Sequence, residues 1–368
     1  MYNTDNRIVV TLDAGGTNFV FSAVQGNKYI LDPIVRPSES SDLDKCLSNI
    51  KDGFRDVITH LGDLKPAAIS FAFPGPADYP NGIIGGYLPN FPSFRNGVAL
   101  GPMLKEIFHI PVYINNDADL YAYGEALSGA LPEVNGRLTE LGSVKQYHNL
   151  LGYTLGTGFG FGFVTDNKLH VGDNSCVETY CLKHKDNSSV IVEDGVSVRA
   201  VKRVYAELSG DVSSVFEPRD ICDIAEGKRD GNVAAAKGAF AKMGEVMGDA
   251  IATAVTLIDG IVVIGGGIIG AKKYIMPSFF KEMRSQIHTL SGDTLNRVQM
   301  EVYDLDAEGE FAKFAKGNAS RLKVYGTDRY VMYDPLKRIG VATTKIGASR
   351  AIALGAYAFA LNQLDKIA

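Results

Sequence analysis

One short pattern occurs twice in this chain and limits the folds that the chain can adopt. Residues 8–29 and 150–169 each read as an apolar strand, a turn of glycine and threonine, a second strand, and a turn with Asn-Lys. Corresponding residues, such as Thr17 and Thr157, lie 140 positions apart. A shared spacing and order favour a duplicated unit. We therefore predict two similar α/β domains, each built around one copy.

Glycine takes every second position where the second copy reads LGTGFGFG. Glycine weakens a strand, because it costs backbone entropy and brings no side chain to pack. A strand with one bare face must allow something to approach its backbone closely. We expect Gly156, Thr157 and Gly158 to approach a ligand, and Gly160 and Gly162 to approach a neighbouring backbone.

Composition and charge argue against several classes of partner. The chain has 368 residues, a net charge of −5 and no block of basic residues, which a nucleic-acid surface would need. Its longest apolar stretch, residues 250–271, is interrupted by Asp259 and Gly260, which favours a helix, a turn and a strand over a membrane span. The first residues lack the pattern of a signal peptide, and the four cysteines form no CxxC. We expect a reduced, cytoplasmic protein.

The rest of the sequence alternates between strand and helix patterns. Strands are predicted at 67–73, 111–117 and 260–267, and helices at 41–62, 118–130 and 346–364. Residues 190–258 are predicted to be largely helical, and the charged residues 304–340 to be irregular or an insertion. Asp117 is predicted to be the N-cap of the helix that follows it.

Three glycine-rich turns follow apolar strands directly, at 13–18, 155–160 and 264–270. Glycine in such turns lets backbone N–H groups crowd around an anion, as a phosphate site requires. Asp13 can hold a hydrated Mg²⁺ bound to that phosphate. One such turn alone can simply close a hairpin, whereas three together favour nucleotide phosphates.

Two other nucleotide-binding motifs fit less well. The chain has no GxxxxGK[ST] and therefore no P-loop. Gly265, Gly267 and Gly270 match GxGxxG, but the acidic residue expected about 20 positions later, at the end of the next strand, is not evident. NAD binding is therefore disfavoured.

Five segments together resemble the motifs of sugar kinases of the ROK family (repressors, open reading frames and kinases), in the actin/hexokinase/Hsp70 ATPase superfamily. In chain order they are DAGGT, FPGPADYPNGIIGGYLPNFP, NNDADLYAYGEA, LGTGFGFGFVTDNKL and VVIGGG. The resemblance implies a two-domain, actin-like ATPase fold of the α/β class (ribonuclease H-like) with an interdomain cleft. The implied domains are 1–117 plus 346–368, and 118–345. ATP and Mg²⁺ are the implied cofactors, and a homodimer is the implied assembly.

The resemblance also implies roles for particular residues. Asp117 would be the general base that takes the proton of the sugar hydroxyl. Further contacts with the sugar would come from Gly75, Asn90, Asn116, Glu178 and Glu193, although Asn90 also suits a turn. The phosphates and the nucleoside would lie on the three glycine-rich motifs, with Asp13 near the Mg²⁺: Asp13, Gly15, Gly16, Thr17, Asn18, Gly156, Thr157, Gly158, Gly265, Gly266 and Gly267.

One segment departs from the family pattern. Zinc-containing members carry a histidine and a cysteine cluster where this chain has GDNSCVETYCLKHKDNSSVIVEDGVS. Cys176, Cys181 and His184 are the only local soft ligands, whereas a structural zinc site needs four. We expect no structural zinc.

The predicted function is ATP-dependent phosphorylation of a hexose or N-acetylhexosamine. The alternative is a sugar-binding or sugar-sensing ROK protein that has no catalytic activity. Repressors of the family carry a helix-turn-helix before the first phosphate motif, and here that motif begins at residue 13, so we expect no DNA-binding domain.

Overall fold

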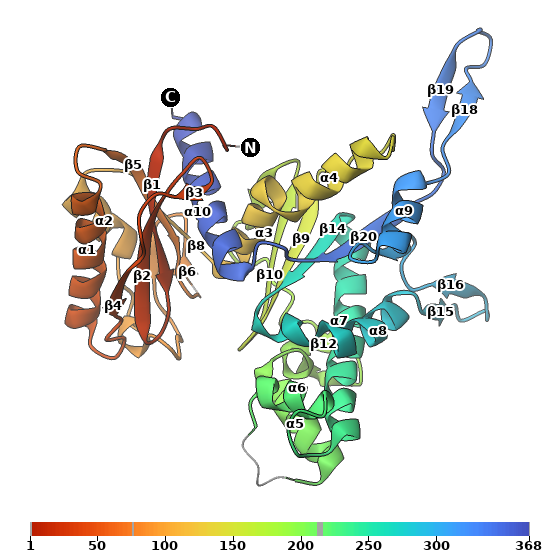
Figure 1. Cartoon of the computed structure of the whole chain (residues 1–368), viewed down its shortest axis with the longest axis horizontal. Helices are drawn as coiled ribbons and strands as arrows, with labels where there is room; N and C mark the ends of the chain where they lie inside the picture. Colours follow the sequence, from red (N-terminus) through yellow and green to blue (C-terminus); the bar gives the residue numbers. More distant parts are fainter. Residues whose placement is uncertain (1, 76, 212–215, 368) are drawn as a thin grey trace. The chain divides into compact units, whose positions relative to one another are not determined.

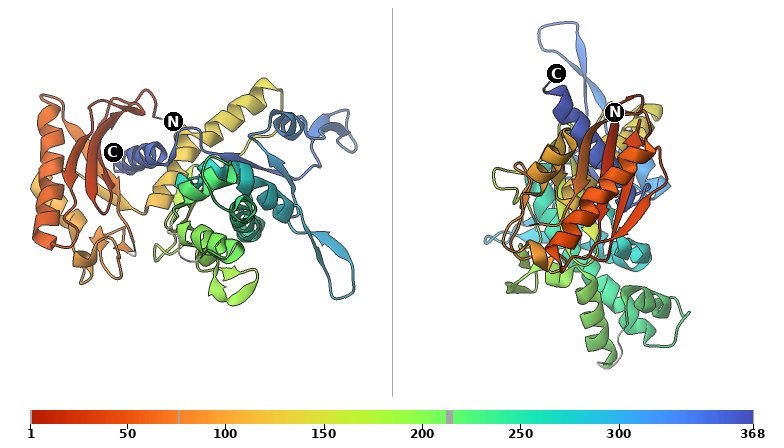
Figure 2. Two further views of the ribbon diagram at one scale, coloured as in Figure 1. Left: turned by 60° about the horizontal axis from the view of Figure 1, so that its bottom comes forward. Right: turned by 90° about the vertical axis from the view of Figure 1, so that its left-hand side faces the viewer.

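The computed structural model describes residues 2–75, 77–211 and 216–367. The chain forms two compact units (Figures 1 and 2). Unit 1 comprises Met1–Gly129, Gly162–Val177 and Ile346–Ala368, and unit 2 comprises Ala130–Phe161 and Glu178–Lys345. Within the described ranges, no helix has the length and apolar character needed to cross a bilayer.

Unit 1 is built on a sheet with the strand order β3-β2-β1-β5-β8, and β4 also pairs with β2. Strand β1 runs antiparallel to β2 and parallel to β5, which is parallel to β8. The strands are β1 (Ile8–Ala14), β2 (Asn18–Gln25), β3 (Lys28–Tyr29), β4 (Ile34–Pro37), β5 (Pro66–Ala72) and β8 (Val112–Asn115), with a separate pair β6 (Ala77–Asp78) and β7 (Ile83–Ile84). The helices are α1 (Leu43–His60), α2 (Leu100–Phe108), α3 (Asp117–Ser128) and α10 (Ala348–Asp365).

Helices cover both faces of this sheet, as Figure 1 shows. On one face, residues of α1 and α2 such as Phe54 and Leu104 join the strands in a core rich in phenylalanine. On the other face, α10 buries Leu354 and Tyr357 against β1 and β5. Helices α3 and α10 pack backbone to backbone, because a Cβ on Gly124 would lie 1.9 Å from the Ala351 carbonyl oxygen.

A second sheet has the strand order β11-β10-β9-β14-β20-β17. Its strands are β9 (Leu150–Leu155), β10 (Phe159–Thr165), β11 (Lys168–His170), β14 (Ile261–Gly265), β17 (Glu301–Asp304) and β20 (Arg338–Thr343). The helices of unit 2 are α4 (Ala130–Glu140), α5 (Val198–Ser209), α6 (Pro218–Ala225), α7 (Val233–Ile258), α8 (Lys272–Met283) and α9 (Glu308–Lys316). Three two-stranded hairpins complete it: β12–β13 (Lys183–His184, Asn187–Ile191), β15–β16 (Gln286–His288, Thr294–Asn296) and β18–β19 (Ser320–Lys323, Tyr330–Tyr333).

The two sheets share the arrangement that the repeat predicts. Each begins with the three repeated strands in the order third, second, first, and continues with a parallel strand beside the first. The turns match in backbone conformation, since Asn27 and Asn167 have φ of 62° and 61°. Positive φ at the central turn positions suits the twist of a hairpin, and asparagine tolerates it.

Two expectations from the sequence need correction. The expected irregular stretch 304–340 contains helix α9 and an extended hairpin, β18–β19. The N-cap of α3 is Asn116, and Asp117 is the first residue inside the helix. The compact units have other bounds than the predicted domains, because α3 and residues 162–177 group with unit 1, and the domain boundaries stay a prediction. Within the predicted helical region 190–258, residues 212–215 lie outside the described ranges, as does Pro76 in the sugar-loop motif.

Candidate active site

The polar residues of unit 1 gather at one edge of its sheet. Strands β1, β5 and β8 are parallel, so their carboxyl ends lie at the same edge, where α/β sheets bind ligands. Asp13 lies at the end of β1, Gly75 follows β5, and Asn116 and Asp117 follow β8. The fold therefore places at one sheet edge predicted site residues from three segments, Asp13, Gly75 and 116–117, that lie far apart in the sequence.

Asp117 is held at the N-terminus of α3 by one backbone donor. The Ala118 N–H donates to Asn116 Oδ1 at 2.8 Å and to Asp117 Oδ1 at 2.9 Å. Among the described residues Asp117 has no ion-pair partner. Its carboxylate therefore keeps acceptor capacity for a hydroxyl proton.

The charge of Asp117 is disfavoured by its surroundings. Its side chain is reachable from solvent, but enough protein surrounds it that desolvation raises its pKa, and repulsion from Asp13 adds to this rise. Hydrogen bonds from the backbone oppose part of the rise. Desolvation also raises the pKa of Asp13. A base whose pKa lies nearer to neutrality accepts a proton more strongly.

Asp119, one residue beyond Ala118 in α3, was not singled out from the sequence. Asp119 is only 7% exposed. Desolvation, with a smaller contribution from repulsion by Asp117, raises the pKa of Asp119 to about 8. A carboxyl group with that pKa is largely neutral at pH 7. The apolar residues Ala118 and Leu120 flank Asp119, but only the fold reveals that it is buried.

The first phosphate motif forms a tight turn between β1 and β2. The Gly15 N–H donates to the Asn18 carbonyl at 3.1 Å, and the Ser38 hydroxyl donates to the Gly16 carbonyl at 2.5 Å. A Cβ on Gly16 would lie 3.2 Å from the Cβ of Asn90. The turn predicted to bind phosphate therefore touches the asparagine predicted to bind sugar.

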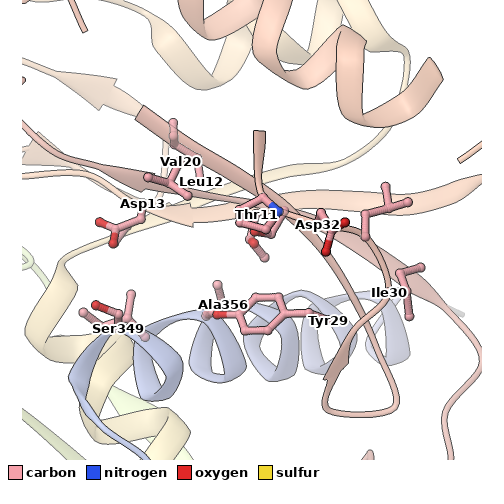
Figure 3. A pocket seen from close by; sticks show the side chains of 15 residues that line it. Thr11, Leu12, Asp13, Val20, Tyr29, Ile30, Asp32, Ser349 and Ala356 are labelled. Atoms are coloured by element: carbon pink, nitrogen blue, oxygen red, sulfur yellow. The ribbon is translucent and has the colours of Figure 1, made fainter. Parts of the chain in front are cut away.

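Asp13 opens into a cavity of about 710 Å³ within unit 1, between strands β1 and β2 and helix α10 (Figure 3). Thr11 and Asp13 point from β1 toward the helix. Thr11 and Ser22 are 4% and 8% exposed, and their hydroxyls have no hydrogen-bond partner among the described residues. The cavity is lined by both polar and apolar side chains, and it is large enough to hold water beside Asp13.

Asp13 and this cavity fit a hydrated Mg²⁺. Mg²⁺ prefers oxygen ligands and keeps several of its waters, usually binding through one or two carboxylates together with phosphate. The side chain of Asp13 makes no hydrogen bond or ion pair to the described part of the chain, so its carboxylate oxygens are available. Water in the cavity next to it can complete the hydration shell.

The second phosphate motif forms the corresponding turn in unit 2. The Gly156 N–H donates to the Gly158 carbonyl at 3.1 Å. The Gly156 carbonyl accepts from the Val198 N–H at 2.9 Å, which ties the turn to the first residue of α5. A Cβ on Gly156 would meet nothing within 4 Å, so the surface of this turn is open to a ligand.

The carboxylate of Glu193 contacts the backbone at this turn. Its Oε2 accepts from the Phe159 N–H at 3.0 Å, and its Oε1 pairs with Arg199 at 2.8 Å. A Cβ on Gly158 would lie 2.7 Å from Glu193 Oε2, so glycine is needed there for this close contact. Both oxygens of Glu193 therefore contact its own chain, and its role as a sugar ligand stays a prediction. Glu178 is half-buried in unit 2.

The bare strand face behaves as predicted at Gly162. A Cβ there would lie 2.6 Å from the Ala118 carbonyl oxygen, so the glycine lets β10 lie against the first turn of α3. The contact explains why Gly162 and the residues after it group with unit 1. For Gly160 the close backbone neighbour stays a prediction.

The third glycine motif lies next to the second phosphate turn. Gly266 has φ of 93°, and a Cβ on it would lie 2.3 Å from the Leu155 carbonyl oxygen, immediately before Gly156. The backbone of residues 265–267 therefore packs directly against the end of β9. Gly267, which begins a 3₁₀ turn, has open space at its Cβ position.

The segment at the zinc-motif position forms the hairpin β12–β13. Lys185, in its turn, pairs with Glu245 at 2.9 Å and with Glu282 at 2.8 Å, which fastens the hairpin to α7 and α8. Cys176 and Cys181 are exposed. The described residues contain no group of three or more His, Cys, Asp or Glu that could hold a metal ion, so the side chains present do not fit a tetrahedral zinc.

Comparisons with known proteins agree with this architecture. The crystal structure of a glucokinase from Parabacteroides distasonis ATCC 8503 is 58% identical in sequence, with a TM-score of 0.90 over 98% of this chain and 99% of that one. The glucokinase of Thermotoga maritima is 28% identical over 318 residues, 74% of this chain and 89% of its own. A ROK-family glucokinase from Streptomyces griseus, solved with glucose and AMPPNP, is 17% identical with a TM-score of 0.59 over 96% of this chain and 98% of that one, and shows the fold alone.

The fold that these structures share with the chain is the two-domain, actin-like ATPase fold predicted from its motifs. The model of the ROK family matches residues 9–302, which include all three glycine-rich turns and the segment of Asp117. From this match and the order of its motifs, we conclude that the chain belongs to the ROK family.

Proposed function

We propose that the protein is an ATP-dependent sugar kinase with Asp117 as its general base. The observation that carries this proposal is the carboxylate of Asp117. It is reachable from solvent at the sheet edge, has no cation paired with it in the described structure, and has a raised pKa. A residue that only capped a helix would need none of these properties. The 58% identity with a glucokinase supports a carbohydrate as the substrate.

In the proposed reaction, Asp117 accepts the proton of a sugar hydroxyl while the oxygen of that hydroxyl attacks the γ-phosphorus of ATP. The bond from the γ-phosphorus to the β–γ bridging oxygen breaks, and ADP leaves with the electron pair. Asn116, next to Asp117, offers an amide that can donate to a second hydroxyl.

In this proposal, both phosphate turns bind the phosphates of ATP. Asp13 would hold a hydrated Mg²⁺, which would supply charge neutralisation at the phosphates. Backbone N–H groups of residues 13–18 and 156–158 contact the phosphate oxygens. Gly265, Gly266 and Gly267 leave space for the nucleoside beside the second turn.

For the sugar we propose glucose or another hexose, including an N-acetylhexosamine. Glucose is the first candidate because the 58% identical structure is a glucokinase. Gly75, Asn90, Asn116, Glu178 and Glu193 are the proposed contacts. We also propose a cytoplasmic homodimer, as the family resemblance implies.

Release of ADP tests the proposal. A coupled assay over hexoses and N-acetylhexosamines should show turnover with at least one sugar. Asp117→Asn should lower kcat by about 10²-fold or more and still bind ATP, because proton transfer by a positioned base contributes about 10²–10⁴-fold. Asp63→Asn, at an exposed position in the turn after α1, is the matched control and should leave kcat unchanged.

The alternative, a sugar-binding protein without catalysis, predicts a different result. Such a protein would bind sugar, as measured by calorimetry, and release no ADP with any sugar. Near-normal turnover by Asp117→Asn would instead show that Asp117 is not the base.

A further inference from the structure

One edge of the sheet of unit 1 has no partner strand. Strand β8 is the last strand of this sheet, and within the described structure it pairs only with β5. The Phe73 N–H, just after β5, donates to the Asn115 carbonyl at 3.0 Å, so residues 113 and 115 turn their backbone groups toward β5. Successive residues of a strand direct these groups to opposite edges. Val112 and Ile114 therefore direct theirs away from the sheet.

A cavity of about 320 Å³ lies along this free edge, within unit 1. All four residues of β8 line it, together with residues of α10 and of segments 79–80 and 171. The side chains of Val112 and Ile114 pack in the phenylalanine-rich core, which leaves their backbone groups to face the cavity. Within the described structure no hydrogen bond reaches these N–H and C=O groups. The free edge therefore offers donors and acceptors to a ligand.

Three aromatic side chains line the cavity: Tyr79, Tyr113 and Phe359. The rings of Tyr113 and Phe359 meet edge to face with their centroids 6.0 Å apart, and Tyr123 contacts Phe359 in the same way at 6.2 Å. Tyr79 is 6% exposed, and its hydroxyl donates to the Phe73 carbonyl at 2.9 Å. Rings held in this way provide a fixed apolar surface for a planar ligand.

Two side-chain amides add polar groups to the cavity. Asn115 is 4% exposed, and its Nδ2 is buried without a hydrogen-bond partner in the described structure. Gln363, on α10, is half-buried. No charged side chain is among the described residues that line the cavity. A charged ligand would lose its hydration there without gaining an ion pair, so the cavity favours a neutral ligand.

From this lining we propose that the cavity binds a neutral, planar nitrogen heterocycle with an N–H next to a C=O, as in pyrimidine and purine bases. The ring N–H donates to the Val112 carbonyl, and the ring C=O accepts from the Ile114 N–H. The aromatic side chains contact the faces of the ring. This assignment goes beyond the proposed function and does not depend on it, because no residue that lines the cavity is among the proposed sugar and ATP contacts.

Other ligand classes fit the cavity less well. A monosaccharide carries hydroxyls on most of its carbons, and the mainly apolar lining would leave several of them unpaired, at about 1–3 kcal/mol each. Sugar phosphates and nucleotides bring charges that no lining side chain would pair. An extended peptide can add to a free strand edge. A cavity of about 320 Å³, near the lower end of the range of about 300–1,000 Å³ for small-molecule sites, suits a single ring better.

Uracil and 1,3-dimethyluracil provide a matched pair of probes. They share one ring, but the two methyl groups remove both N–H donors. Binding to the full chain is followed by saturation-transfer NMR, with excess AMPPNP and Mg²⁺ present to occupy a nucleotide site elsewhere in the chain. Uracil should bind about tenfold or more tightly than 1,3-dimethyluracil, because the methylated ring would leave the Val112 carbonyl buried and unpaired.

Two tryptophan substitutions test the place of binding. Val171→Trp fills the cavity from a half-buried residue that lines it, and Val144→Trp, at a residue 55% exposed in unit 2, is the matched control. Val171→Trp should raise the Kd of uracil about tenfold or more, whereas Val144→Trp should leave it unchanged. Circular dichroism checks that both variants fold. If Val171→Trp does not fold, Gln363→Ala replaces it, with the exposed Gln299→Ala as control, and loss of one hydrogen bond should raise the Kd severalfold.

Three results would overturn the proposal: no binding of uracil up to its solubility limit, equal binding of the two probes, or equal binding of uracil to the wild type and to the folded cavity variant. The first would mean that the cavity holds only water. The second would mean that the free edge of β8 does not read the ring, and the third that uracil binds elsewhere. None of these readouts measures turnover, so they stand apart from the ADP-release assay, and failure of either assay leaves the other unaffected.

Discussion

Asp119→Asn should make the stability of the protein less sensitive to pH. Asp119 is buried beside Asp117, and its pKa is raised from an ordinary 3.8 to about 8. A raised pKa in the folded state means that unfolding favours loss of the proton. The stability that Asp119 contributes is therefore complete below about pH 4, falls as the pH rises toward 8, and stays constant above it.

The size of the effect follows from the shift. Each unit of pKa corresponds to about 1.4 kcal/mol, so at pH 7, roughly three units above the unfolded value, a buried Asp119 costs about 4 kcal/mol relative to a neutral isostere. Asparagine has nearly the same shape and does not titrate. Whatever constant difference the amide introduces, the variant should gain about 1.4 kcal/mol on the wild type per pH unit between pH 5 and 7.

Urea unfolding followed by circular dichroism at pH 5, 6, 7 and 8 measures this difference. Asp63→Asn, at an exposed position, is the control and should track the wild type at every pH. The reasoning fails if the free energies of unfolding of the wild type and of Asp119→Asn run parallel across this range. Parallel curves would mean that Asp119 is already ionised in the folded protein and finds a partner there.

Three further substitutions test the packing and the ion pairs. Gly162→Ala should lower the free energy of unfolding by about 1–3 kcal/mol in thermal or urea unfolding, because its Cβ would press on a rigid carbonyl oxygen 2.6 Å away. Gly156→Ala is the control, because its Cβ would lie in open space, and it should change the free energy of unfolding by less than about 1 kcal/mol. Similar losses in both variants would contradict this account. Desolvation alone would raise the pKa of Asp306, but hydrogen bonds from Lys345, Thr343 and Lys272 outweigh it and lower the pKa to about 2. The stability that Asp306 contributes is therefore present above about pH 4 and is lost as the pH falls toward 2. Asp306→Asn should lower the Tm at pH 7, and between pH 7 and 3 its Tm should fall less than that of the wild type. An unchanged Tm at pH 7 would show that these ion pairs do not contribute to stability.

Much of the framework could be predicted because it rests on local patterns. The repeated hairpins, with Asn27 and Asn167 in matching turns, need only short-range signals of strand and turn. The predicted helices α1, α3 and α10 are confirmed as elements, since apolar spacing and caps are local. The motifs also place Asp13 and Asp117 at one sheet edge, which follows once the strands are known to be parallel.

What could not be predicted depends on contacts between distant segments. The burial of Asp119 depends on how α3 sits in unit 1, and the bond of Glu193 to the Phe159 N–H joins residues 34 positions apart. The predicted N-cap, Asp117, and the observed one, Asn116, differ by one position because both side chains accept from the same N–H group, that of Ala118. Both faces of the hairpin in the segment 304–340 are exposed. The segment therefore lacks the alternation of apolar and polar residues by which a half-buried strand is predicted.

The glycine contact between α3 and α10 has a consequence for synthesis on the ribosome. The segment that completes unit 1, helix α10, is translated after all of unit 2. Until it emerges, the apolar residues of β1 and β5 that pack on Leu354 and Tyr357 have no cover, and the groove beside Gly124 is unfilled. Unit 2 can therefore fold first, whereas unit 1, which carries Asp13 and Asp117, cannot complete its fold until α10 is translated. A nascent chain stalled before residue 346 should expose that half to proteases and chaperones.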